Sequence, residues 1–165
     1  MTIELWSADG RLRLRPWSAG DLPAVVAAAG DPLLRRWTSL PAPDVAEAER
    51  WLGAQDHGWA SGERLSFAVH DGDRLAGGVV LKNAERAEAG YWTVAAFRGR
   101  GVAPRALEAI CGWARAAGRT ELDLMHQVDN AASCRVAEKS GFELRRVLPA
   151  QPPFPRAGHL HTRQL

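Results

Sequence analysis

The sequence predicts a mixed α/β fold, with one domain extending over residues 1–165. Its length of 165 residues suits a single domain with a hydrophobic core of its own. Short segments with alternating apolar residues, typical of strands, are interspersed with longer segments whose apolar residues recur at helical spacing. Glycine, proline and aspartate separate these segments. The expected order is β-α-α-β-β-β-α-β-α-β-β.

The first third of the chain predicts one strand and two helices. Residues Arg11–Trp17 alternate, as in a strand that ends at Pro16. Asp21 is placed to cap a short helix with the sequence "LPAVVAAA", and "GDPLLRRW" then begins another turn or helix. Asp44 and Glu47 have the spacing of a capping box, which predicts a longer helix through "VAEAERWLGAQDHGWAS".

The middle of the chain predicts three neighbouring strands. The segment "RLSFAV" alternates, and Asp71-Gly72-Asp73 is a tight hairpin signal that leads into a returning strand, Leu75–Lys82. Gly77-Gly78 within that strand indicates a bulge or a close backbone approach. Glu88–Ala95 is the next expected strand.

The last third predicts two helices and three strands. One helix covers Gly101–Ala117 and ends at Gly118, and a second, "AASCRVAEKS", is capped by Asn130 and stopped by Gly141. The expected strands are "TELDLMHQV", "FELRRVL" and "HLHTRQL", with the proline-rich loop "PAQPPFPRAG" before the last one.

The composition favours a protein without a nucleic-acid or membrane partner. The 21 Lys and Arg residues nearly balance 19 Asp and Glu, giving a net charge of +2. No apolar run approaches the length of a membrane span, and the start, "MTIELWSADG", lacks the features of a signal peptide. The two cysteines, Cys111 and Cys134, form neither a disulfide framework nor a metal-binding pattern. We expect a soluble cytoplasmic protein, monomeric or homodimeric, that needs no metal.

The segment "FRGRGVAPRALEAICGWA", Phe97–Ala114, predicts an anion site. Its glycines immediately precede a helix, whose N-terminus presents unpaired N–H groups and a partial positive charge. Such a turn suits a phosphate or pyrophosphate. It is not a P-loop, because the Gly-Lys-Ser/Thr ending is missing, and it is not the dinucleotide fingerprint, because Pro104 stands where the third glycine belongs.

The segment Arg98–Ala103 resembles the Arg/Gln-x-x-Gly-x-Gly/Ala motif of the GNAT superfamily of acyl-CoA-dependent N-acetyltransferases. "RLRLRPW", "AEAGYWTV" and "DNAASCRVAEKSGF" also look like segments of that family, in the right order, so the resemblance runs from about Arg11 to Leu148. It is closest to the RimJ/RimL branch, which acts on N-termini of ribosomal proteins. It implies a mostly antiparallel sheet of about seven strands, splayed between strands 4 and 5 and flanked by about four helices.

The resemblance also implies acetyl-CoA or coenzyme A as co-substrate. Backbone N–H groups of the glycine-rich turn would hold the pyrophosphate, whereas the side chains of Arg98 and Arg100 are either phosphate ligands or solvated. The fourth strand would offer backbone groups to the pantetheine arm, with an N–H of Val94 or its neighbour on the thioester carbonyl; Trp92 is also a candidate for the core. The expected coenzyme contacts are Trp92, Thr93, Val94, Arg98, Gly99, Arg100, Gly101, Val102, Ala103, Asn130 and Ser133.

The catalytic residues implied by the resemblance are Ser133, as donor of a proton to the departing thiolate, and Glu88, as the base that takes a proton from the amine. Other candidates for the base are His126, His70 and Asp123. Many relatives carry a tyrosine where this chain has Ala137, so tyrosine acid chemistry is not expected. Cys134 is either an acyl-accepting thiol near the thioester or a partly buried core residue.

The acceptor is the least defined part of the expectation. Trp37, Trp51, Trp59 and Phe154 lie in the segments that line the acceptor site in this family, and they form either an apolar wall or core. The final segment lacks the Asp and Tyr often seen in the RimJ/RimL branch. We therefore expect direct transfer of an acetyl group from acetyl-CoA to a small amine or a peptide N-terminus. The alternative is a non-catalytic acyl-CoA sensor.

Overall fold

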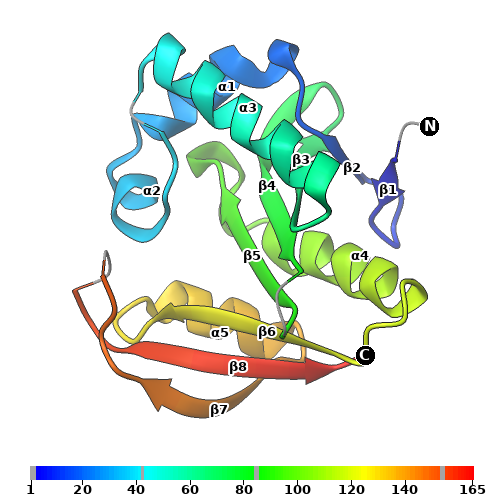
Figure 1. Ribbon diagram of the computed structural model, residues 1–165, viewed down its shortest axis with the longest axis vertical. Coiled ribbons are helices and arrows are strands. Elements are labelled where there is room, and N and C mark those ends of the chain that lie inside the picture. The colour runs from blue at the N-terminus through cyan, green and yellow to red at the C-terminus, as the bar shows by residue number, and fades with distance from the viewer. Residues whose placement is uncertain (1–2, 42, 84–85, 153–154) are drawn as a thin grey trace.

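The computed structural model describes residues 3–41, 43–83, 86–152 and 155–165. These residues form one eight-stranded sheet and five α-helices (Figure 1). The strands are β1 (Leu5–Trp6), β2 (Leu12–Pro16), β3 (Arg64–Asp71), β4 (Arg74–Lys82), β5 (Glu88–Thr93), β6 (Glu121–Gln127), β7 (Glu143–Leu148) and β8 (Gly158–Gln164). The helices are α1 (Leu22–Ala29), α2 (Pro32–Trp37), α3 (Val45–Ser61), α4 (Val102–Ala116) and α5 (Ala131–Lys139), with short 3-10 turns at Ala19–Asp21 and Ala95–Phe97.

The sheet divides in the middle. Its strand order is β1-β2-β3-β4-β5-β6-β8-β7, and all neighbours are antiparallel except β5 and β6, which run parallel. That parallel ladder contains only the pairs Glu88↔Asp123 and Ala89↔Leu124. Beyond Ala89 the two strands diverge toward their carboxyl ends (Figure 1). The splay expected between the fourth and fifth strands is therefore present at β5 and β6.

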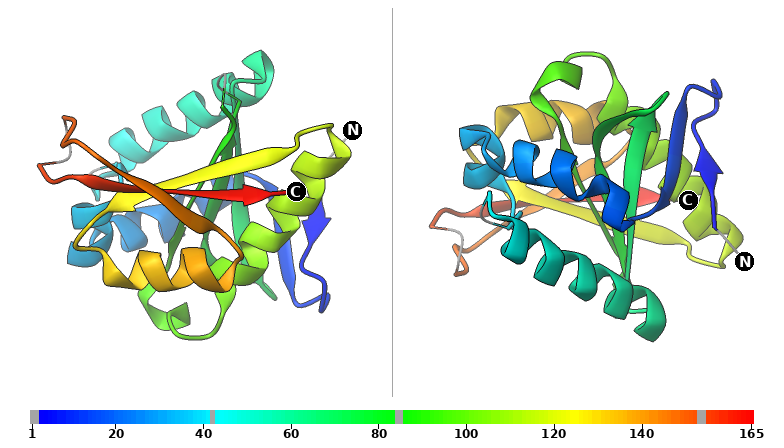
Figure 2. Two further views of the ribbon diagram at one scale, coloured as in Figure 1. Left: turned by 90° about the horizontal axis from the view of Figure 1, so that it is seen from below. Right: turned by 90° about the horizontal axis from the view of Figure 1, so that it is seen from above.

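The helices cover both faces of the sheet. Figure 2 shows α4 and α5 on one face and α1, α2 and α3 on the other. The larger core lies under α4, where Leu107 and Ile110 pack on strand residues such as Phe67. Apolar residues of α4 gather on one side of the helix, as the sequence spacing predicts. A smaller core around Trp17 and Val25 lies under α1 and α3.

The close approach expected at Gly77-Gly78 is confirmed. A Cβ atom at Gly78 would lie 2.6 Å from Nε1 of Trp92 and 2.9 Å from the Trp17 ring. The two indoles stack with their centroids 5.8 Å apart. A glycine is required because any side chain there would displace this aromatic pair.

Two details differ from the sequence prediction, the added strand β1 and the role of Asp21, and a third, left open between a turn and a helix, is settled. Strand β1, Leu5–Trp6, adds an eighth strand; it is too short to give an alternating pattern. The ambiguous segment after Asp31 is helical, since the Asp31 side chain accepts a hydrogen bond from the N–H of Leu33. Asp21 makes no side-chain cap on α1.

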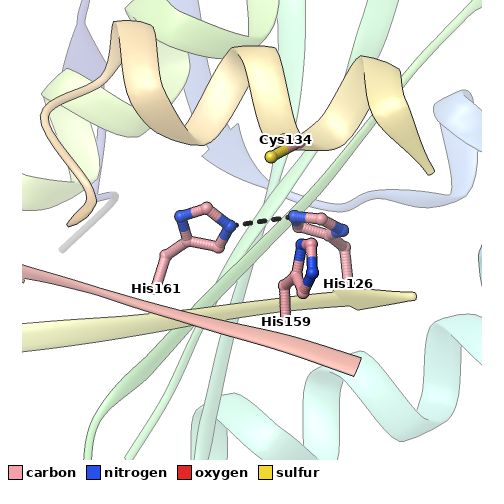
Figure 3. A group of neighbouring side chains, drawn as sticks. All are labelled: His126, Cys134, His159 and His161. Atoms are coloured by element: carbon pink, nitrogen blue, oxygen red, sulfur yellow. Dashed lines mark hydrogen bonds between the residues drawn. The ribbon is translucent and has the colours of Figure 1, made fainter. Parts of the chain in front are cut away.

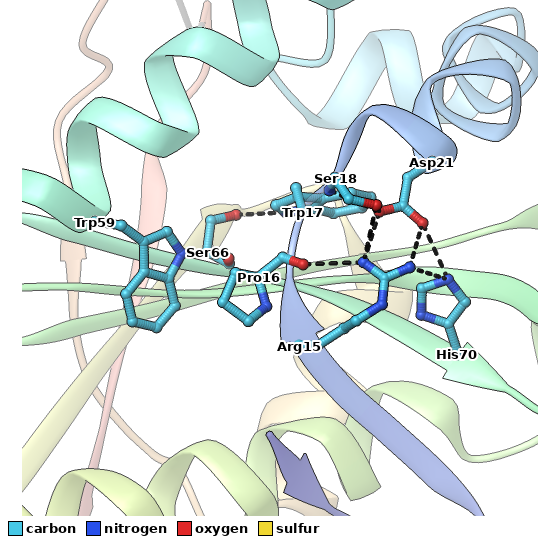
Figure 4. A network of polar contacts seen from close by, with 8 residues as sticks. All are labelled: Arg15, Pro16, Trp17, Ser18, Asp21, Trp59, Ser66 and His70. Atoms are coloured by element: carbon cyan, nitrogen blue, oxygen red, sulfur yellow. Dashed lines mark hydrogen bonds and ion pairs between the residues drawn. The ribbon is translucent and has the colours of Figure 1, made fainter. Parts of the chain in front are cut away.

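The Asp21 carboxylate instead belongs to a buried polar network (Figure 4). Its two oxygens accept hydrogen bonds from both terminal nitrogens of Arg15 at 2.8 Å. Nε2 of His70 lies 3.1 Å from the same carboxylate, and the backbone N–H of Ser18 donates to it at 2.9 Å. Burial raises the pKa of Asp21, but the hydrogen bonds from His70, Arg15 and Ser18 outweigh burial and hold this pKa well below its usual value.

Among the described residues, no helix is long and apolar enough to cross a membrane.

Candidate functional site

The divergence of β5 and β6 opens a cavity of about 670 Å³. Its walls come from the open ends of β5 and β6, the first turns of α4 and α5, and helix α2 on the far side. The N-termini of α4 and α5 thus reach one cavity from two different segments of the chain. This arrangement brings backbone donors and polar side chains to the gap in the sheet.

The glycine-rich turn at the mouth of the cavity presents free N–H groups. Gly99 and Gly101 have φ values of +73° and +71°, a region that side chains other than that of glycine rarely allow. In the described part of the chain, no acceptor lies in hydrogen-bond geometry with the backbone N–H groups of residues 99–103. Because α4 begins at Val102, its dipole adds a partial positive charge here. The turn can therefore bind an anion through its backbone alone.

Arg105 supports this turn and was not predicted. It donates through Nε to the carbonyl of Gly101 at 3.0 Å and through Nη2 to that of Arg100 at 2.5 Å. Its third nitrogen donates to Asp9 at 2.9 Å. The first two bonds hold the carbonyl groups of the turn in place. The residue lies four positions after Gly101, one helical turn away, which is the only signal of this role in the sequence.

The structure distinguishes the two arginines of the turn. The Arg98 side chain forms an ion pair with Asp31 at the start of α2, so much of its charge is already compensated. The Arg100 guanidinium lies 5.7 Å above the ring of Phe97 and is exposed. Arg98 lines the cavity, whereas Arg100 does not.

The open edge of β5 carries unpaired backbone groups. The N–H of Val94 donates to the carbonyl of Ala76 at 2.9 Å, so Val94 itself cannot be the expected donor to a thioester carbonyl. Successive N–H groups of a strand point to opposite sides. Those of Tyr91 and Thr93 therefore face the gap toward β6, and the neighbour of Val94 that fits the donor role is Thr93.

Helix α5 brings two predicted residues to the cavity. The Asn130 side chain accepts a hydrogen bond from the N–H of Ser133 at 3.1 Å and caps the helix, as predicted. The Ser133 hydroxyl lies 2.8 Å from the phenol oxygen of Tyr91 on β5. Burial raises the pKa of Tyr91 to about 12, so the phenol keeps its proton near neutral pH.

Tyrosine acid chemistry was not expected because Ala137 stands at the family's usual tyrosine position, and the structure shows where the chain's own tyrosine lies. Ala137 is fully buried, but Tyr91 brings a phenol to Ser133 across the splayed strands. The signal available in the sequence was that Tyr91 is the only tyrosine and lies in the strand that precedes the glycine-rich turn.

The four candidates for the base lie in different places. Glu88 is paired with Lys82 at 2.5 Å, and Lys82, but not Glu88, lines the cavity. Asp123 is buried in contact with Arg86 and Thr162, and His70 belongs to the Asp21 network, so neither faces the cavity. His126 lines the cavity, and its Nε2 lies 3.0 Å from Nε2 of His161.

The aromatic residues expected at the acceptor site have separate roles. Trp37 lines the cavity from α2, and Trp51 lines a smaller adjoining pocket. Trp59 packs edge-on against Phe67 in the core. Phe154 lies outside the described residues.

Four possible metal ligands meet beside the cavity, although the spacing of the cysteines gave no metal-binding pattern. His126, Cys134, His159 and His161 offer ligand atoms that all lie within 4.8 Å of one another. The spacing of His159 and His161, two residues apart in one strand, was the signal in the sequence. Their proximity to His126 depends on strand pairing, which the sequence alone does not give.

Comparisons with known proteins agree with this geometry. Residues 11–143 match the family model of the acetyltransferase (GNAT) domain, whereas no curated protein sequence matches the chain. The fold is similar to that of RimL, a ribosomal L7/L12 alpha-N-protein acetyltransferase, with a TM-score of 0.87 and 20% identity over 100% of this chain and 96% of that one.

Two further structures share the fold and contain ligands. Mycobacterium smegmatis RimJ in complex with CoA-disulfide has a TM-score of 0.84 and 19% identity, covering 99% of this chain and 86% of that one. The microcin C7 self-immunity acetyltransferase MccE, in complex with acetyl-CoA and AMP, has a TM-score of 0.82 and 18% identity, with 94% and 93% covered.

Proposed function

Because this chain belongs to the GNAT acetyltransferase family, we propose that it transfers an acetyl group from acetyl-CoA directly to a primary amine bound in the same cavity. The observation that carries the proposal is the cavity at the splayed strands, which has free backbone N–H groups at its mouth and the Tyr91–Ser133 pair in its wall. Acetyl-CoA supplies an activated thioester, and the amine supplies the nucleophile.

The residues present fit coenzyme A. The positive φ angles of Gly99 and Gly101 expose backbone donors where a pyrophosphate would need them, and a Cβ at Gly99 would meet nothing within 4 Å, so the turn is open. The free edge of β5 offers Tyr91 and Thr93 backbone groups to the amide groups of a pantetheine arm. Asn130, whose Oδ1 caps α5, keeps its side-chain N–H₂ available to the ligand.

Ser133 and Tyr91 provide a proton on the thiolate side of the reaction. Ser133 Oγ donates the proton that the departing sulfur needs, and Tyr91 Oη, 2.8 Å away, replaces it. The N–H of Thr93 stabilises the negative charge that develops on the thioester oxygen. The pair acts as a unit, because the serine hydroxyl alone is a weak acid.

Glu88 is the proposed base on the amine side. It shares the face of β5 with Gly90 and Trp92, which line the cavity, since alternate residues of a strand lie on one face. Its Oε1 is paired with Lys82, so a water molecule would carry the amine proton to the carboxylate. Glu88→Gln tests this role, with Lys82→Met as the control for loss of the ion pair. If Glu88 is the base, Glu88→Gln should lower kcat/KM by ~100-fold or more, whereas Lys82→Met should have a much smaller effect.

The acceptor is a small amine or a peptide N-terminus. Trp37 and Trp92 give the cavity apolar walls, and Arg64 contributes a cationic wall, since the charge of Lys82 is compensated by Glu88. A cationic wall favours an amine that also bears a carboxylate or another anionic group. RimL, with the same fold, is an alpha-N-acetyltransferase of ribosomal L7/L12, which makes acidic N-terminal peptides a first panel to test.

The test is a thiol-release assay with acetyl-CoA over small amines and N-terminal peptides. We expect turnover with at least one amine, and a ~100- to 10,000-fold lower kcat for Ser133→Ala and Tyr91→Phe, estimated from the usual contribution of acid catalysis. The double variant should lose little more than either single variant, because the two hydroxyls act together. Tight coenzyme binding without thiol release on any amine would favour a sensor instead.

A further inference from the structure

We propose that His126, His159, His161 and Cys134 form a binding site for one zinc-like divalent ion, a property independent of acetyl transfer. The site connects β6, β8 and α5 beside the cavity (Figure 3). Three observations support it: the convergence of the side chains, the orientation of their imidazoles, and an unpaired buried nitrogen.

Strand pairing explains the convergence. His126 on β6 lies directly opposite His159 on β8, and His161 follows two residues later on the same face. Figure 3 shows the three imidazoles below α5, which places Cys134 above them. The ring centroids of His126 lie 5.2 Å from His159 and 5.0 Å from His161. Ligands from three elements thus meet in one place.

The imidazoles of His126 and His161 are oriented as metal ligands. Nδ1 of His126 lies 2.8 Å from the carbonyl of Gln127, and Nδ1 of His161 lies 3.4 Å from the carbonyl of Phe142. A carbonyl can only accept, so each Nδ1 carries the proton and each neutral ring presents a lone pair at Nε2. These two Nε2 atoms face each other at 3.0 Å. Two lone pairs at that distance would repel each other, so we infer that the two nitrogens share a cation, either a proton or a metal ion.

His159 and Cys134 complete a four-coordinate set. Nδ1 of His159 is buried and has no hydrogen-bond partner among the described residues. Within the described ranges, the Cys134 sulfur makes one weak hydrogen bond, to Glu138 at 3.8 Å. Tetrahedral zinc needs ligand atoms ~3.3 to 3.7 Å apart, from zinc–nitrogen and zinc–sulfur bonds of about 2.0 and 2.3 Å. The ligand atoms lie within 4.8 Å of one another, so the widest pairs would close by about 1 Å on binding, while the two Nε2 atoms now 3.0 Å apart would separate slightly.

The ligand chemistry identifies the class of ion. Three imidazoles and one thiolate favour zinc, or cobalt as its spectroscopic substitute, over magnesium or calcium, which prefer oxygen. On binding, Cys134 releases its thiol proton to solvent and the thiolate coordinates the ion. Four protein ligands leave no open position, so the site is structural. It would fix α5, and with it Asn130 and Ser133, against β6 and β8.

The experiment uses untagged full-length protein freed of metal and titrated with Zn²⁺ or Co²⁺ alone. We expect one Zn²⁺ per chain by equilibrium dialysis, a thiolate-to-cobalt charge-transfer band with Co²⁺, and a higher melting temperature with Zn²⁺. Cys134→Ser and His126→Gln should each weaken Zn²⁺ binding at least ~100-fold, as loss of a ligand does. Cys111→Ala and His57→Gln, which change a buried cysteine and an exposed histidine elsewhere, should leave it unchanged.

Two results would overturn the proposal. One is the absence of stoichiometric Zn²⁺ binding by the folded wild-type chain, which would mean that the facing imidazoles share a proton instead. The other is a charge-transfer band that persists in Cys134→Ser. Circular dichroism of each variant establishes that it is folded. His126 is only half-buried, so His126→Gln is a second ligand variant that should fold if Cys134→Ser does not.

Discussion

Substitution of Gly101 by aspartate is expected to weaken coenzyme A binding strongly while leaving the chain folded. Gly101 is the N-cap residue of α4 and has a φ of +71°. A Cβ atom there would have open space, because the nearest neighbour is Nε of Arg105 at 3.8 Å. Aspartate and asparagine both tolerate this left-handed conformation, at a cost of about 1 kcal/mol of stability. The new carboxylate would point among the N–H groups proposed to hold the pyrophosphate.

The size of the effect follows from the charges. Two like unit charges ~5 Å apart repel by about 3 kcal/mol at an effective dielectric constant of ~20, which corresponds to a roughly 200-fold weaker affinity. Arg105 can neutralise little of the new charge, since it already donates to Asp9 and to the carbonyls of Arg100 and Gly101. The N–H groups that hydrogen-bond to the new carboxylate would no longer be free for the ligand, which would weaken coenzyme binding further.

Calorimetric titration with coenzyme A measures this change, with Gly101→Asn as the matched control. Asparagine has the same shape and the same backbone cost but no charge, so its affinity should stay within about tenfold of the wild type. The difference between the two variants should shrink at high salt, because exposed charges are screened. Equal affinities for the aspartate and asparagine variants, both folded, would refute the assignment of the turn as the pyrophosphate site.

Two further predictions concern stability. Asp21→Asn should lower the free energy of unfolding by about 3 kcal/mol at neutral pH, since Arg15 and His70 lose a buried anionic partner. The folded-state pKa of Asp21 is depressed from its ordinary 3.8, so the wild-type advantage is complete above about pH 5 and declines as pH falls below 4. Urea unfolding across pH 3 to 7 measures this, and a gap that widens in acid would contradict it. Gly78→Ala should cost about 1–3 kcal/mol because its methyl group displaces the indole of Trp92. Gly112→Ala, on an exposed part of α4 with nothing within 4 Å, is the control and should not lower the melting temperature.

The parts of the fold that depend on local pattern could be predicted from the sequence. The strands and helices follow from periodicity, and the turn before α4 follows from glycines whose positive φ angles leave few alternatives. The misreading of Asp21 shows the limit of local rules. An aspartate before a helix suggests a cap, but Arg15 and His70 compete for the same carboxylate. His70 lies 49 positions away in the chain.

The same limit explains what the sequence did not reveal about the site. Tyr91 and Ser133 are 42 residues apart and meet only because β5 and α5 lie on opposite sides of the gap. The histidine cluster depends on the register of β6 against β8; a shift of one residue would move His159 and His161 to the other face of the sheet. Pairing register between distant strands is set by the packing of the whole domain.

The two-pair ladder between β5 and β6 also has a mechanical consequence. Every other seam of the sheet beyond β2 carries at least five residue pairs, so this seam is where the molecule divides most easily into two lobes. A ligand in the gap would bond to β5 on one side and α5 on the other, and would thereby serve as the missing stretch of sheet. We expect coenzyme A to slow amide hydrogen exchange throughout β6, β8 and β7, including residues that it never touches. Bound coenzyme would link the two lobes, so the lobe that contains these strands could no longer open separately.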